Sequence, residues 1–134
     1  MTTTLGTASI ACTAALGLLL FGLGFAVSRA RFARRRGSGH DHDPRDMLHK
    51  LVRAHANTAE FAPFLAVLFL AHGARGHAAW VAWAMAGATA CRFLIVAGLV
   101  AWPSLDEANP VRFVGALGTY VLGAALSLAL LLPA

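Results

Sequence analysis

Residues 5–27 contain no charged side chain, and five arginines follow within the next nine positions. A transmembrane helix needs about 20 mostly apolar residues, so this stretch is long enough to cross a bilayer. It does not fit a secretory signal peptide, because no basic residue precedes it, the apolar run is too long and the basic cluster comes after it. We therefore expect a first membrane span over residues 5–27.

The composition agrees with a membrane protein. Of the 134 residues, 58% are hydrophobic and 13% are charged, which is too little charge for the surface of a small soluble domain. The net charge of +5 does not indicate nucleic-acid binding, because six of the eleven basic residues crowd between Arg29 and Arg45 with Phe32 as the one interleaved aromatic residue. Cys12 and Cys91 lie in apolar runs without ligand-like neighbours, which favours packing over metal or redox chemistry.

Three further spans are expected over residues 46–71, 78–101 and 111–132. Between them lie a polar linker at about 29–45 and two turns, HGARGH and WPSLDEANP. The sequence thus predicts one domain over residues 1–134, an all-α bundle of four transmembrane helices.

The basic residues also predict the orientation of the chain. Arginine and lysine concentrate in cytoplasmic loops, and here they crowd into the first linker while neither terminus carries one. We expect that linker in the cytoplasm and both termini outside. Three tryptophans lie near the expected span ends, where indole rings favour the membrane interface: Trp80, Trp83 and Trp102.

The second span carries polar residues that lipid cannot satisfy. At about 100° per residue, four of them share a narrow face of a helix: Lys50, Arg53, Asn57 and Glu60. Such a stripe must face protein or a water-filled cavity.

Two interpretations of this stripe are open. In the first, Glu60 forms an ion pair with Arg92 of the third span, and Asn57 adds a hydrogen bond between helices. In the second, Arg53 and Arg112 join the acid and the amide in a site for a small anion that also bears an amino group. The flat, permanently charged fork of arginine suits carboxylates, and this interpretation also accounts for the additional arginines.

The segment RAHANTAEFAPFLAVLFL resembles the second-helix signature of the MAPEG family, the membrane-associated proteins in eicosanoid and glutathione metabolism. The matching residues are Arg53, His55, Asn57, Glu60 and Pro63. An arginine in the third span and one that opens the fourth agree with the family as well, and the resemblance extends over essentially the whole chain.

The resemblance implies a bacterial-type member of the family, a homotrimer in the inner membrane. It implies that glutathione binds as a cosubstrate between subunits and is conjugated to, or reduces, hydrophobic electrophiles from the bilayer. The implied glutathione set is Arg29, Arg31, Arg53, His55, Asn57, Glu60, Arg92 and Arg112. Arg112 is the expected catalytic residue, because a positive charge beside the sulfur favours the reactive thiolate.

The sequence departs from active members of the family in its tyrosines. Such members often carry tyrosines in the third helix after the arginine, where this chain has Ile95 and Leu99. Phe61 stands where some members have tyrosine, and the single tyrosine is Tyr120 in the fourth span. A non-catalytic membrane scaffold is therefore an alternative to an enzyme. A small four-span transporter is a weaker one, because its essential acid belongs in the first span, which has no charged group.

The motif HDHD, from His40 to Asp43, offers two histidines and two carboxylates to a metal ion. We expect these side chains to be solvated on a flexible linker that does not order them, and we predict no metal site.

Overall fold

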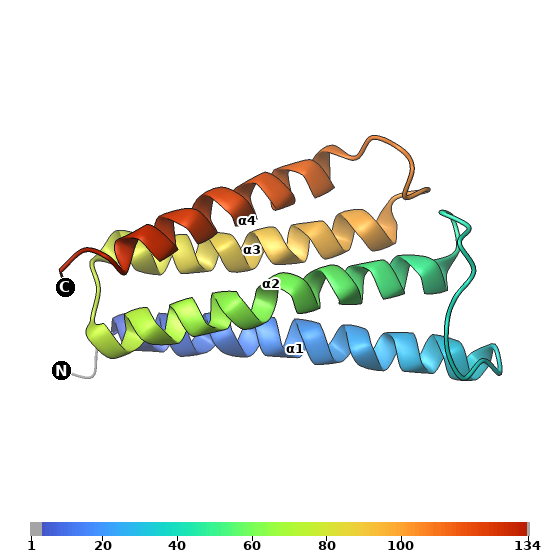
Figure 1. Cartoon of the computed structure of the whole chain (residues 1–134), viewed down its shortest axis with the longest axis horizontal. Helices are drawn as coiled ribbons and strands as arrows, with labels where there is room; N and C mark the ends of the chain where they lie inside the picture. The colour runs from blue at the N-terminus through green and yellow to red at the C-terminus, as the bar shows by residue number, and fades with distance from the viewer. Residues whose placement is uncertain (1–3, 134) are drawn as a thin grey trace.

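The computed structural model describes residues 4–133. Within that range the chain forms four helices and no strand (Figure 1): α1 (Thr4–Ala33), α2 (Met47–Arg75), α3 (Ala79–Ala101) and α4 (Pro110–Ala129). Each helix is long and apolar enough to cross a membrane. The predicted all-α bundle of four transmembrane helices is confirmed, and the chain is an integral, multi-pass membrane protein.

The helices lie side by side and alternate in direction (Figure 1). The start of α1 and the end of α4 therefore lie at one end of the bundle, which we call the terminal end. The opposite end, here the linker end, carries residues 34–46 and residues 102–109. α1 packs along α2 and α3 packs along α4, whereas α2 and α4 barely touch.

The first two helices run farther than the sequence predicted. α1 continues to Ala33 because residues 28–33 hold no glycine or proline, and the chain turns only near Arg35, whose φ is 53°. α2 continues to Arg75 and ends at Gly76, whose φ is 75°. The expected turn HGARGH is therefore mostly helical, and two arginines of the expected linker belong to α1.

Gly73, part of that expected turn, lies inside α2 and serves helix packing instead. A Cβ atom at this position would lie 2.6 Å from Oγ of Ser9 in α1. The same hydroxyl donates a hydrogen bond to the carbonyl of Phe69 at 2.5 Å. Glycine here lets α1 approach α2 closely, as small residues do between membrane helices.

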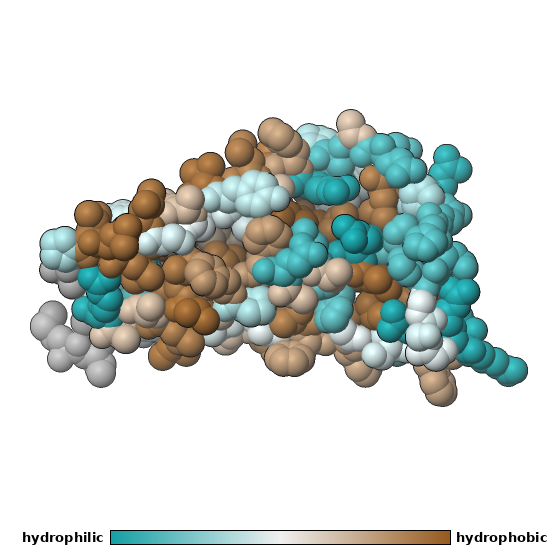
Figure 2. Space-filling model, viewed as in Figure 1, coloured by the Kyte–Doolittle hydropathy of each residue, from teal (hydrophilic) through white to brown (hydrophobic). Residues whose placement is uncertain are grey.

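Apolar side chains fill the bundle and also cover its outside. One buried cluster lies toward the terminal end around Phe69 and Met85, and a smaller one lies toward the linker end around Ala54 and Ile95. Many other large apolar side chains face outward, as a lipid-facing surface requires. Figure 2 shows hydrophobic residues over much of the half nearer the termini and hydrophilic residues gathered at the linker end.

The two linkers are fastened to the helices and to each other. Lys50 in α2 is buried, and its Nζ donates to the carbonyls of Trp102 at 2.7 Å and Pro103 at 3.1 Å. These carbonyls lie at the C-terminal end of α3, where a positive charge interacts favourably with the helix dipole. The N–H of Leu105 donates to the carbonyl of Pro44 at 3.0 Å. The first linker therefore has contacts that order it, whereas we expected it to lack such a scaffold.

Asp46 joins the first linker to the start of α2. Its carboxylate accepts a hydrogen bond from the N–H of His49 at 2.9 Å and lies 2.7 Å from the guanidinium of Arg34. Burial alone raises the pKa of Asp46, but the hydrogen bonds from His49 and Arg34 outweigh it and leave that pKa below its ordinary value of 3.8. The carboxylate is thus an N-cap that is charged at neutral pH.

Asp46→Ala is expected to lower the free energy of unfolding by about 1 kcal/mol at neutral pH, as for a lost N-cap. A carboxylate with a lowered pKa stabilises the folded state above its unfolded pKa, and the contribution disappears as the pH falls through the lowered value. Thermal unfolding in detergent should therefore show a difference at pH 7 that shrinks once the pH drops below 3.8. Identical stability at pH 7 would contradict the assigned cap.

Candidate functional site

Arg92 lies near the middle of α3 and is wholly buried, with 0% of its surface exposed. Its Nη2 donates to Oδ1 of Asn57 in α2 at 2.6 Å and to the main-chain carbonyl of the same residue at 2.9 Å. The ring of Phe61 lies 4.9 Å from the guanidinium carbon, within range of a cation–π contact. An amide and an aromatic ring therefore hold the buried charge.

The expected ion pair between Glu60 and Arg92 does not form. Glu60 is exposed, and its carboxylate has no hydrogen bond or ion pair with any residue that the structure describes. The expected hydrogen bond between helices at Asn57 does form, and its partner is Arg92. The ion-pair interpretation is thus wrong about the acid and right about the amide.

Several hydroxyl side chains in the spans find a partner in their own helix. In four cases the hydroxyl donates to the carbonyl four residues earlier: Thr58, Thr89, Thr119 and Ser127. The side chains of Arg53, Glu60 and Arg112 differ, because they are exposed and have no such partner between residues 4 and 133. A charge against lipid is costly, most of all halfway along a span as at Glu60.

Arg112 is placed by the junction between α3 and α4. Asn109 caps α4, with Oδ1 accepting from the N–H of Arg112 at 3.0 Å and Nδ2 donating to the carbonyl of Gly98 at 2.7 Å. Pro110 occupies the first turn, where its missing N–H costs nothing. A Cβ atom at Gly98 would lie 2.9 Å from the main-chain nitrogen of Arg112. The absence of a side chain there lets the start of α4 rest on α3.

The remaining predicted residues lie toward α1. Arg29 lines a cavity of about 330 Å³ between α1 and α2. Nε of Arg31 donates to the carbonyl of Gly39 in the first linker at 3.3 Å. The ring of His55 packs against Gly24 of α1, where a Cβ atom would lie 3.3 Å from Nε2. The structure therefore joins Asn57 of α2 directly to Arg92 of α3. The ring of His55, also on α2, packs against α1 instead.

A groove of about 350 Å³ lies between α2 and α4, with Glu60 on its wall. Its apolar lining includes Phe64, Leu65, Leu68, Gly123 and Ala124. Tyr120 lies on the α4 side, with its ring centroid 5.8 Å from that of Phe61. The groove thus combines one carboxylate and one phenol with an apolar wall.

The sequence did not predict that Tyr120 lies close to Arg92 and Asn57. Phe61 connects Tyr120 to Arg92, because its ring touches both the Tyr120 ring and the guanidinium of Arg92. No local pattern predicts this, since the contact depends on how α4 returns along the bundle. Ile95 and Leu99, at the positions where active members of the family carry tyrosines, are buried in the apolar cluster near the linker end.

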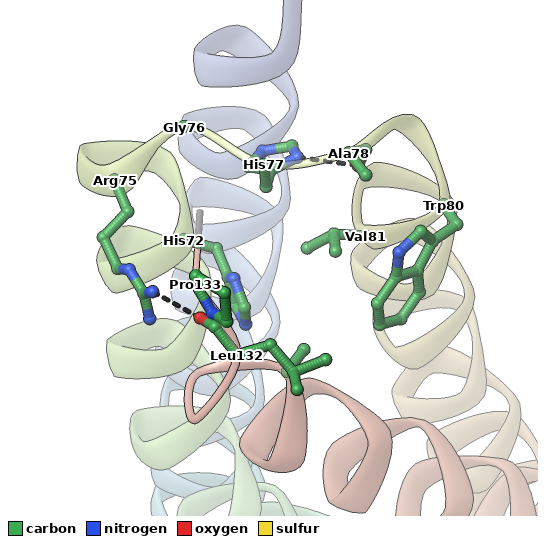
Figure 3. A pocket seen from close by; sticks show the side chains of 10 residues that line it. His72, Arg75, Gly76, His77, Ala78, Trp80, Val81, Leu132 and Pro133 are labelled. Atoms are coloured by element: carbon green, nitrogen blue, oxygen red, sulfur yellow. Dashed lines mark hydrogen bonds between the residues drawn. The ribbon is translucent and has the colours of Figure 1, made fainter.

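A cavity of about 440 Å³ at the terminal end has a structural role (Figure 3). Arg75 donates to the carbonyls of Leu130 at 2.6 Å and Leu132 at 2.7 Å, and the ring of His72 lies 2.9 Å from the carbonyl of Leu126. The last carbonyls of a helix have no partner within it. These two side chains therefore close the end of α4.

The sequence model described as MAPEG family matches residues 9–132, which is nearly the whole chain and includes most of α1 and all of α2, α3 and α4. No curated protein and no solved structure matches it.

Proposed function

The chain belongs to the MAPEG family, and we propose that it binds glutathione as a homotrimer and conjugates it to hydrophobic electrophiles, or uses it to reduce them. The observation that carries this proposal is the unpaired, exposed carboxylate of Glu60 halfway along the membrane-spanning helix α2. A charge at that depth needs water, protein or a charged ligand around it. Arg53 lies two turns earlier on the same helix and has the same need.

The exposed charges match the ionised groups of glutathione, which has two carboxylates and one ammonium group. Glu60 pairs with the ammonium group, and Arg53 and Arg112 donate to the carboxylates. The side-chain oxygen of Asn57 accepts a hydrogen bond from Arg92, so both of its amide hydrogens are available to the ligand. Arg92 is then a positioning residue, because it is buried and orients Asn57.

A second copy of the chain supplies the cover that these charges require. Arg29 lines the cavity between α1 and α2, whereas Glu60 lines the groove between α2 and α4. The two surfaces involve different neighbours of α2. In a closed symmetric assembly, one such surface of a subunit can face the other surface of the next subunit. A trimer of this kind lets both sets of side chains contribute to one pocket.

The chemistry follows from the charge at the start of α4. Arg112 lowers the pKa of the glutathione thiol and so favours the thiolate. The thiolate attacks an electrophilic carbon, a carbon–sulfur bond forms, and the leaving group departs with its bonding electrons. The apolar wall of the groove between α2 and α4 suits a hydrophobic co-substrate, and we expect the hydroxyl of Tyr120, which lines the same groove, to donate a hydrogen bond to it.

A glutathione-binding scaffold without catalysis is the second candidate. It is favoured by Ile95 and Leu99, which put buried apolar groups where active members of the family carry tyrosines. Conjugation of glutathione to an aryl halide by the purified protein separates the two candidates. Turnover supports the enzyme, whereas tight binding without turnover supports the scaffold.

The proposal is tested by calorimetric titration of the detergent-purified protein with glutathione. Arg53→Ala, Arg112→Ala and Glu60→Gln are each expected to weaken binding by about 1.5 kcal/mol, or about tenfold, because each removes a charged hydrogen bond. Arg45→Ala is the matched control, since it removes an exposed arginine of the first linker outside the spans. No binding by the wild type at millimolar glutathione would reject the proposal, as would unchanged affinity in the three variants.

A further inference from the structure

Three histidines gather at the linker end. His40 and His42 come from the HDHD motif, and His49 comes from the first turn of α2. One nitrogen of each ring lies within 4.8 Å of the corresponding nitrogen of the other two. The rings meet at steep angles rather than stacking, with centroids 4.6 to 5.8 Å apart. One nitrogen from each of three imidazoles therefore lies within a small volume.

The spacing is close to that of a metal site. A tetrahedral zinc ion bound at about 2.0–2.1 Å places its nitrogen ligands about 3.3 Å apart. The three nitrogens therefore need to close by at most about 1.5 Å, which rotation of exposed or half-buried side chains allows.

The hydrogen bond of His49 leaves its other nitrogen available to a metal. Nδ1 of His49 lies 3.1 Å from the carbonyl of Asp43, so it carries the proton and donates. Nε2 then keeps its lone pair. Histidines that bind metals usually donate their second ring N–H to a carbonyl or carboxylate in this way.

The surrounding chain holds these residues in place. Arg31 donates to the carbonyl of Gly39, directly before His40. Arg36 pairs with Asp41 at 3.1 Å, between the two histidines of the motif. Arg31 at the end of α1 and Arg36 in the first linker therefore hold the histidine segment in place. The pair with Asp41 also offsets the charge of Arg36, which would otherwise oppose a bound cation.

We propose that His40, His42 and His49 bind one divalent transition-metal ion, with Zn²⁺ as the leading candidate. Imidazole nitrogens suit zinc, copper and nickel, whereas magnesium and calcium prefer oxygen ligands. Three histidines leave the fourth tetrahedral position to water. The bound ion clamps the first linker to α2, and because it binds the folded state it raises the thermal stability of the bundle. The site is separate from the proposed glutathione pocket.

The experiment uses protein without a histidine tag, freed of metal with EDTA and then titrated with Zn²⁺ in the absence of glutathione. We expect one ion per chain and a higher Tm with Zn²⁺. With Co²⁺ in place of zinc, we expect the intense visible absorption of tetrahedral cobalt. His40→Ala, His42→Ala and His49→Ala should each weaken binding roughly 10-fold or more, since even the loss of an outer-shell partner costs that much.

His77→Ala is the matched control, because His77 lies at the terminal end beside His72 and outside the cluster. It should bind zinc like the wild type. Melting in EDTA shows whether each variant folds as well as the wild type without metal. Unchanged zinc binding in His49→Ala would mean that His49 is not a ligand and would overturn the proposal. A wild type that binds no stoichiometric ion, or a His77→Ala protein that loses the ion, would overturn it as well.

Discussion

Replacing Asn57 with alanine is expected to lower the free energy of unfolding by about 3 kcal/mol. Arg92 has 0% of its surface exposed, and Asn57 provides both acceptors of its Nη2. Alanine removes the side-chain oxygen at 2.6 Å and leaves a buried guanidinium with one acceptor fewer. Removing the partner of a buried charge lowers the stability by more than the net contribution of the hydrogen bond, because the charge stays buried without compensation. Unfolding by SDS titration in mixed micelles measures the loss.

Two further variants show whether Arg92 is the cause. Glu60→Gln should stay within about 0.5 kcal/mol of the wild type in stability, because Glu60 has no ion pair with Arg92, while its glutathione affinity falls. Asn57→Ala combined with Arg92→Met should recover much of the loss, because no buried charge then lacks a partner. A destabilised Glu60→Gln protein beside a stable Asn57→Ala protein would contradict the assigned contacts.

The four spans could be predicted from the sequence because they depend on local properties. Length and apolarity place a span such as residues 5–27, and a cluster of arginines marks its end. The helix itself continues to Ala33. The thickness of the bilayer sets the length of the apolar segment, but a helix can extend beyond the membrane. Arginine and alanine are good helix formers, so nothing in residues 28–33 ends α1.

The contacts of the site could be predicted only in part, because they depend on the register between helices. Spacing of three and four residues was enough to align Arg53, Asn57 and Glu60 on one face of α2. It was also clear that Arg92 needed a partner. Charge alone favoured Glu60 as that partner. The register of α3 against α2 brings Arg92 to the amide of Asn57 instead.

The same limit applies to the histidines. His49 is seven residues from His42, and nothing in the spacing indicates that the start of α2 lies against the HDHD motif. The contact arises because Asp43 accepts from His49 and the linker folds back at the end of α1. A motif that seemed to lack a scaffold therefore has one, and the scaffold is made by residues on both sides of it.

Gly98→Ala is expected to lower the free energy of unfolding by about 2 kcal/mol, as for an overpacked site, and to weaken glutathione binding. The new Cβ atom would lie 2.9 Å from the main-chain nitrogen of Arg112 and 3.2 Å from its Cα. Main-chain atoms cannot rotate aside as a flexible side chain can, so the first turn of α4 must shift. The hydrogen bond from Asn109 to the carbonyl of Gly98, now 2.7 Å long, weakens as well. Arg112 moves with that turn and loses its place in the proposed pocket.

Gly17→Ala is the matched control, because a Cβ atom at Gly17 in α1 meets nothing within 4 Å. This variant should unfold like the wild type or be up to about 1 kcal/mol more stable, since alanine favours helix over glycine. The pair is compared by SDS titration and by glutathione calorimetry under the same conditions. If Gly98→Ala matches Gly17→Ala in both measurements, α3 does not hold the start of α4 in place. If Gly98→Ala loses stability but keeps its affinity, the position of Arg112 does not limit binding, and its role in the pocket must be given up.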